Sequence, residues 1–145
     1  MNKVALLHRL NPTHWPEWEQ HIPPGQDVDI WFETGRRVAS EIHSGLPVFV
    51  PGTDGIGVVA TGETVSGVEY CPDPLWMIAP EAERSRYTEP ANRVRVRLHR
   101  INIPIASIRS NPMVSSLPNT ARETTTWLNS GQYLALVDLA RVNDD

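Results

Sequence analysis

The sequence predicts an α+β fold, a small mixed or antiparallel β-barrel with short flanking helices. Strand-like segments recur along the 145 residues, separated by turn residues and short helical stretches. Glycines interrupt the β-rich segment 56–65, as is typical of strands that bulge or bend in a curved barrel. Segment 92–101 alternates valine or leucine with arginine, which indicates a strand with one buried face. Antiparallel strands with helices at the ends give this fold class.

Six strands are expected, at residues 3–8, 28–32, 47–51, 56–65, 92–101 and 124–128. In the fifth strand the alternation predicts that Val94, Val96 and Leu98 face the core. The same alternation predicts that Arg93, Arg95 and Arg97 face outward.

Four helices are expected. Thr13 is the predicted cap of a short helix, which ends at residues 22–25. A second helix is expected to begin at Thr34 and to run to about Ser44. Pro104 begins a short third helix, and Ser130 is the predicted cap of a last helix that ends near residue 142. Residues 66–91 are rich in proline and charge and are expected to form the longest irregular stretch.

Length and composition indicate one domain over residues 1–145. The apolar share of 40% is that of a globular protein with one core. No apolar run approaches the roughly 20 residues that span a bilayer, and His8 and Arg9 end the apolar N-terminal stretch too early for a signal peptide. We therefore expect a cytoplasmic protein without a membrane partner. Cys71 is the single cysteine, which excludes an internal disulfide and a thiolate zinc cluster.

The net charge of −4 argues against a protein that coats nucleic acid non-specifically. The charge is uneven, because arginines crowd residues 84–109 while acidic residues crowd 17–33. Twelve of the thirteen basic residues are arginine, which favours bidentate or stacked contacts over diffuse attraction. Local recognition of nucleic acid therefore stays open.

Signatures of catalysis are absent from the sequence. The glycines of 52–57 lack the Lys-Ser/Thr of a phosphate loop, and no histidine pair has the spacing of a zinc protease. Neither a nucleophile elbow nor a carboxylate pair is found. These observations predict a protein that is not an enzyme and that uses no cofactor and no metal.

The aromatic composition points instead to binding. Five tryptophans occur beside only three tyrosines and two phenylalanines. Large rings that flank a cavity hold a base taken out of its stack, because every base offers a π face. Trp31 and Phe32 precede a helix whose first turn carries Arg36 and Arg37, and a helix N-terminus with two arginines suits a phosphate.

Several short motifs follow one another in a definite order. They are Leu7-His8-Arg9-Leu10-Asn11-Pro12, Trp31-Phe32 with Arg36, Gly55-Ile56-Gly57-Val58-Val59, Asp73-Pro74-Leu75-Trp76, Ile103-Pro104-Ile105, and Asn111-Pro112 to Pro118 with Arg122. In order and spacing, over almost the whole chain, they resemble the EVE domains of the PUA-like superfamily. The chain departs from the family at Pro51-Gly52-Thr53, where relatives have Tyr-His-Ser, and at Arg37, where relatives have Asn.

The resemblance implies a PUA-like barrel that reads a modified, flipped-out base in DNA, with RNA as the alternative carrier. Relatives belong to modification-dependent restriction systems, so a nuclease or helicase partner is implied. The implied base-binding residues are Trp31 as the stacking ring, Phe32 and Trp76 as walls, and Pro51, Gly52 and Thr53 at the base edge. The implied phosphate-binding residues are Arg9, Arg36, Arg37 and Arg122, with Arg95 extending the track.

Two other functions remain open at this stage. PUA-like relatives of the ASCH type include small hydrolases that act on RNA or modified nucleosides. The acidic balance and the altered pocket positions also permit a protein-interaction module with a vestigial pocket.

Overall fold

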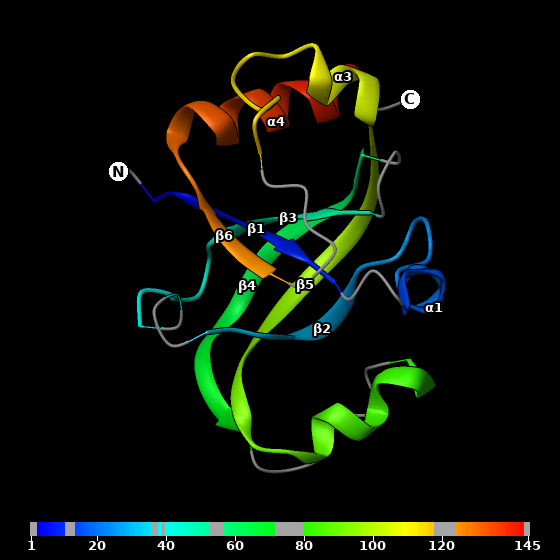
Figure 1. The fold of residues 1–145 in the computed structure, drawn as a ribbon, viewed down its shortest axis with the longest axis vertical. Coiled ribbons are helices and arrows are strands. Elements are labelled where there is room, and N and C mark those ends of the chain that lie inside the picture. The colour runs from blue at the N-terminus through cyan, green and yellow to red at the C-terminus, as the bar shows by residue number, and fades with distance from the viewer. Residues whose placement is uncertain are drawn as a thin grey trace.

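A six-stranded mixed sheet forms the centre of the computed structural model, which describes residues 3–10, 14–35, 38, 40–52, 57–71, 80–117 and 124–143. The strands are β1 (Ala5–Arg9), β2 (Val28–Glu33), β3 (Pro47–Pro51), β4 (Gly57–Cys71), β5 (Ala91–Pro104) and β6 (Thr124–Leu128). Their order in the sheet is β2-β5-β4-β3-β1-β6 (Figure 1). Neighbouring strands are antiparallel except for the parallel pair β1 and β3.

The predicted α+β class is confirmed, but the sheet is not closed into a barrel. Within the described residues β2 and β6 are its two edges, and no pairing joins them. The helices are short: α1 (Trp15–His21), the 3₁₀ helix η3 (Glu81–Thr88), α3 (Ile105–Arg109) and α4 (Ser130–Val142). Figure 1 shows α3 and α4 together at one end of the sheet, η3 at the opposite end and α1 at the side.

Strands β4 and β5 form the long arm of the sheet. Their register shifts between Val58 and Ala60 and again between Thr64 and Val68, which confirms the bulges expected from the glycine pattern. The pairing continues to Cys71 opposite Ala91. The prediction of an irregular stretch over 66–91 is therefore wrong for 66–71, which is strand, and for 81–88, which is a 3₁₀ helix.

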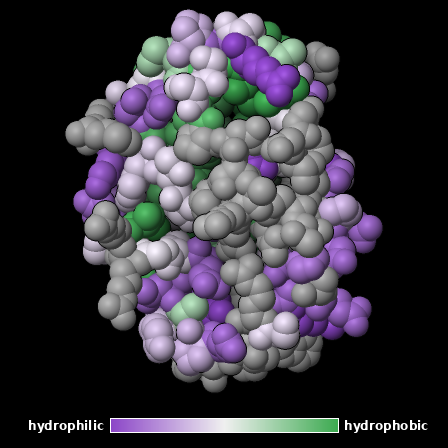
Figure 2. All heavy atoms as spheres, in the orientation of Figure 1, coloured by the Kyte–Doolittle hydropathy of each residue, from purple (hydrophilic) through white to green (hydrophobic). Residues whose placement is uncertain are grey.

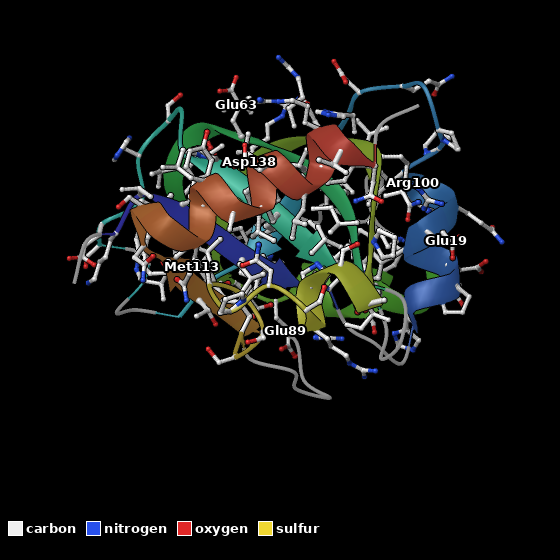
Figure 3. The ribbon with its side chains drawn as sticks, turned by 90° about the horizontal axis from the view of Figure 1, so that it is seen from above. Glu19, Glu63, Glu89, Arg100, Met113 and Asp138 are labelled. Carbon is white, nitrogen blue, oxygen red and sulfur yellow. The ribbon has the colours of Figure 1, made fainter. Side chains whose placement is uncertain are left out.

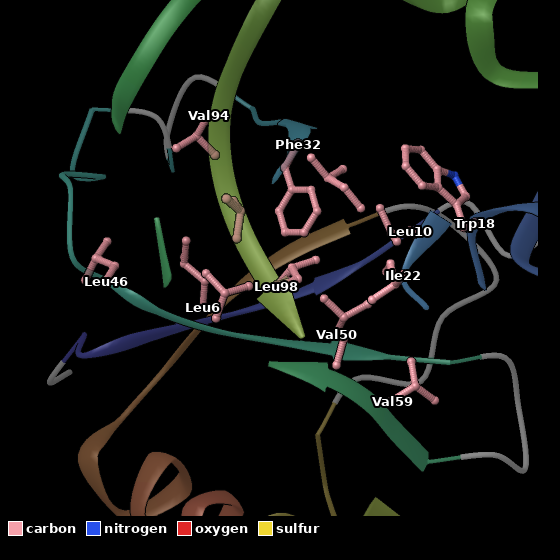
Figure 4. Packing of buried hydrophobic residues seen from close by; sticks show 14 of the residues in the cluster. Leu6, Leu10, Trp18, Ile22, Phe32, Leu46, Val50, Val59, Val94 and Leu98 are labelled. Carbon is pink, nitrogen blue, oxygen red and sulfur yellow. The ribbon is translucent and has the colours of Figure 1, made fainter. Parts of the chain in front are cut away.

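The hydrophobic core has two parts, one on each side of the sheet. The main cluster joins Leu6, Phe32 and Leu98 to Trp18 of α1 (Figure 4). As predicted, Val94, Val96 and Leu98 are fully buried here. The second cluster lies between the sheet and the helices α3 and α4, and it contains Phe49, Ile103, Ile108 and Leu136. On the face shown in Figure 2, hydrophobic side chains are visible mainly over the half where α3 and α4 lie.

Two predicted helix caps are wrong by one residue. Asn129, with an extended backbone, caps α4, because its side-chain oxygen accepts from the backbone N–H of Gln132 at 2.8 Å and the Gln132 side chain accepts in return. Ser130 is thus the first helical residue. At α1 the N-cap position is His14 instead of Thr13, and no side-chain cap bond forms there. Thr13 itself lies outside the described residues.

The second predicted helix does not reach Ser44. Turns occupy 40–41 and 44–45, and Gly45 adopts φ +89° and donates its N–H to the Thr64 carbonyl at 2.8 Å. The residues that would begin this helix lie outside the described part, apart from Val38, which is helical.

The prediction that Arg93 faces outward is wrong. Arg93 is fully buried, and its guanidinium donates to the Glu89 carbonyl at 3.0 Å. The alternation cannot predict this burial, because the covering carbonyl comes from the segment that connects η3 to β5. Arg95 and Arg97 are half-exposed, as predicted.

Candidate functional site

The ends of three strands meet at one edge of the sheet. Parallel strands end at the same edge, so Arg9 at the end of β1 lies near Pro51 and Gly52 at the end of β3. The antiparallel β6 begins at this edge, where Thr124 pairs with Arg9. Arg9 is 6% exposed, and its Nη1 donates to the Gly52 carbonyl at 2.7 Å. The structure thus brings Arg9, a predicted phosphate-binding residue, next to Pro51 and Gly52, two predicted base-binding residues.

A histidine–phenylalanine stack lies behind this edge. The rings of His8 and Phe32 are 3.9 Å apart between centroids and 13° from parallel. His8 Nδ1 lies 2.6 Å from Thr125 Oγ1. Because β1 and β2 are not neighbours in the sheet, this stack spans the concave side of the curved sheet. It ties the edge strand β2 to β1 and β6 through side chains.

Phe32 belongs to the core in this arrangement. Its ring is 1% exposed and lies among the buried residues of the main cluster (Figure 4). It contacts core residues instead of forming the wall of an open pocket. His8, which the sequence reasoning left without a binding role, contacts it directly, and the place of His8 between Leu6 and Leu10 in a strand is the signal for an inward side chain.

Trp31 is placed differently from Phe32. Successive residues of a strand point to opposite faces, so Trp31 is on the face of β2 opposite Phe32. Its side chain is partly buried and packs against the rim of the main cluster, and Trp31 pairs with Arg95 across the strands. The structure thus describes Phe32 as a member of the main cluster and Trp31 as a partly buried neighbour of it, and their roles at a base stay predictions.

Arg95 is held in an ion pair within the protein. Asp29 binds Arg95 Nη2 at 3.0 Å and Arg97 Nε at 2.9 Å across the β2–β5 pair. The hydrogen bond from Arg97 lowers the pKa of Asp29 below its ordinary value, helped by the charges of Arg97 and Arg95 and opposed by partial burial. The same hydrogen bond raises the pKa of Arg97. One carboxylate thus neutralises part of the predicted phosphate track.

Five further predicted site residues lie outside the described part of the chain, and their roles stay predictions. They are Thr53, Trp76, Arg36, Arg37 and Arg122. Described residues near four of them are Gly52, which follows β3, Gly35, which follows β2, and Thr124, which begins β6, whereas the segment that holds Trp76 lies between Cys71 and Pro80.

A buried carboxylate that the sequence reasoning missed joins η3 to α1. Glu83 is fully buried, and its Oε1 accepts a hydrogen bond from Trp18 Nε1 at 3.1 Å. The same oxygen lies 3.2 Å from His14 Nδ1. A charged residue in a 3₁₀ segment carries no sequence signal of burial, because both partners are more than 60 residues away along the chain.

Among the described residues, no group of three or more His, Cys, Asp or Glu side chains is arranged to hold a metal ion. None of the described helices has the length and apolar character needed to cross a membrane. Comparisons with family models, with curated proteins and with solved structures gave no match to this chain.

Proposed function

We propose that this chain binds nucleic acid and reads a modified base, taken out of its stack, at the edge where β1 and β3 end and β6 begins. One observation carries the proposal: Arg9, Pro51 and Gly52, predicted site residues more than 40 positions apart, meet there through the bond from Arg9 to the Gly52 carbonyl. The EVE-type resemblance assigns this same edge to base recognition. A curved β-sheet with α3 and α4 at one end is compatible with a PUA-like relative (Figure 1).

The geometry supports a revised role for Arg9. A phosphate-binding arginine normally lies at the surface, whereas Arg9 is 6% exposed and fixed by a backbone carbonyl. A preorganised guanidinium loses little side-chain entropy on binding and recognises base acceptors such as ring carbonyls. We therefore assign Arg9 to the base edge, beside Gly52, instead of to a flanking phosphate.

Trp31 stays the predicted stacking ring on the strength of the resemblance, although its described neighbours are Arg95 on β5 and the main core cluster. Its indole is partly buried, so its orientation is restricted while part of its surface remains accessible. Phe32 acts indirectly, because its stack with His8 fixes the strand on which Trp31 lies. In this proposal the domain is a non-catalytic, cytoplasmic reader that recruits a nuclease or helicase.

Fluorescence anisotropy with labelled oligonucleotides tests the proposal. Single-stranded and duplex DNA carrying one modified cytosine or adenine should bind more tightly than unmodified DNA, and matched RNA tests the alternative carrier. Trp31→Ala should weaken binding by about 1–3 kcal/mol, the contribution of one stacked base. Tyr70→Ala is the control, since Tyr70 is an aromatic residue that is 67% exposed and lies at the end of β4 opposite to Val58, which pairs with Pro51.

Arg95→Gln provides a second control. Because Asp29 already binds Arg95, its loss should change affinity little. Equal affinity of the wild type for modified and unmodified DNA and RNA, or unchanged affinity in Trp31→Ala, would contradict the proposal.

A further inference from the structure

A groove separate from the sheet edge lies between the C-terminal half of α4 and the β4–β5 pair. Its volume is about 700 Å³, within the usual range of small-molecule sites. Two arginines, Arg100 and Arg141, line it together with Asn102 and Asn143. None of its ten lining residues is acidic, although the chain as a whole carries a net charge of −4. The groove thus presents two guanidinium groups, whose acidic neighbours Glu19 and Asp138 lie outside its lining.

Arg100 has an unused donor beside the groove. Its Nη2 donates to Glu19 of α1 at 3.2 Å, an interaction visible at the side of α1 in Figure 3. Its Nη1 is buried and has no hydrogen-bond partner among the described residues. A buried donor without a partner costs about 1–3 kcal/mol, so an acceptor that draws this guanidinium toward the groove would recover that cost.

Arg141 supplies a second cation, on an exposed side chain. Its side chain is 77% exposed and lies 3.9 Å from Asp138, which is itself 73% exposed. Such a long, solvated pair contributes little, so Arg141 can exchange Asp138 for a ligand at small cost.

The remaining walls are apolar or neutral. Ile101 and Val137 are partly buried, pack against the second core cluster and form apolar parts of the lining. A ligand that fits both kinds of wall has an anionic group and an apolar or aromatic body.

We propose that this groove binds a small organic anion, with Arg100 and Arg141 holding its phosphate or carboxylate and the apolar lining residues contacting its body. Arginine suits this role because its planar fork matches both oxyanions. The site is independent of the nucleic-acid proposal, because it shares none of the residues assigned to the base.

Amide chemical-shift titration of the full chain tests this site. The probes are adenosine 5′-monophosphate, octanoate, inorganic phosphate and the uncharged nucleoside adenosine. The monophosphate or octanoate should shift the backbone amides of Ile101, Asn102 and Asn143, whereas adenosine should not. The monophosphate and octanoate arms distinguish a phosphate ligand from a carboxylate ligand.

Variants define the contribution of each arginine. Arg100→Met and Arg141→Gln should each weaken binding roughly tenfold, the expected loss of one charge-assisted hydrogen bond. Arg109→Gln, an exposed arginine of α3 outside the groove, should bind as the wild type does. Arg141 is exposed, so its variant keeps the fold if Arg100→Met does not.

Three results would overturn the inference. They are the absence of shifts at the groove amides with every anion, wild-type affinity in Arg141→Gln, and shifts produced only by an oligonucleotide. The last result would assign the groove to a nucleic-acid backbone.

Discussion

Asp29 is the residue whose charge state gives the clearest test of the surface electrostatics. Its folded-state pKa is lowered from 3.8, chiefly by the hydrogen bond from Arg97. A carboxyl with a lowered folded pKa stabilises the protein above its unfolded pKa, and this contribution is lost as the pH falls through the folded value. Asp29→Asn should therefore lower the melting temperature at pH 7 by about 1–4 °C, the effect of losing its partly exposed ion pairs with Arg95 and Arg97.

The pH dependence is the decisive part of that measurement. The difference in melting temperature between the wild type and Asp29→Asn should shrink as the pH is lowered below about 4, because the carboxyl then protonates first in the unfolded state and at still lower pH in the folded state. A difference that stays constant from pH 7 to pH 3 would show that the loss comes from packing and not from charge.

Glu83 allows a second prediction at the residue scale. Glu83→Ala removes the acceptor of the Trp18 indole N–H and leaves a buried donor without a partner. The expected loss is about 1–3 kcal/mol in the free energy of unfolding, measured by urea denaturation. Glu83→Gln retains an acceptor oxygen and should lose less. Glu81→Ala, at an exposed position of the same helix, is the control, and a loss equal to that of Glu83→Ala would contradict the assignment.

At the scale of elements, local pattern was sufficient wherever neighbours in sequence decide the structure. The limits of β3 and β6 follow from proline positions and β-branched residues, and the buried face of β5 follows from its alternation. The pattern fails where a group outside the element decides. The buried Arg93 of β5 donates to the Glu89 carbonyl in the segment before that strand, and the buried Glu83 of η3 accepts from Trp18 of α1.

The candidate site shows the same division. The family resemblance implied that Arg9, Pro51 and Gly52 belong to one site, and the strand ends that carry them do meet. The roles that it implied for Trp31 and Phe32 stay predictions. The ion pair of Asp29 with Arg95 was missed, because the two residues are 66 positions apart and only strand pairing brings them together.

At Gly62 the close approach of β4 to β5 leaves no room for a side chain. A Cβ there would lie only 1.7 Å from the Arg97 carbonyl oxygen, which is a backbone atom of the paired strand. Gly62→Ala must therefore push the strands apart, and we expect more than about 3 kcal/mol of destabilisation. Gly67 in the same strand is the matched control, since its Cβ would meet nothing closer than 4.0 Å. Thermal unfolding of the two variants gives the comparison, and equal stability would contradict this account.

On the scale of the whole molecule, two binding surfaces are proposed at different places. The base site is at the edge where β1, β3 and β6 meet, whereas the anion groove lies between α4 and the β4–β5 pair. The net charge of −4 disfavours non-specific coating of nucleic acid. In both proposals, recognition therefore depends on a few positioned arginines.

This charge distribution predicts a weak salt dependence of nucleic-acid binding. Of the five arginines assigned to phosphates by sequence, Arg95 is bound to Asp29 and Arg9 is buried against Gly52, which leaves Arg36, Arg37 and Arg122. Three phosphate contacts give a slope of log K against log salt of about −2 to −3, since each contact contributes about −0.7 on single strands and −0.9 on duplex DNA. Anisotropy titrations between about 50 and 200 mM salt measure the slope. A much steeper slope would mean that the wider arginine-rich face, including Arg95 and Arg97, contacts the nucleic-acid backbone. A slope near zero would mean that none of these arginines contacts a phosphate.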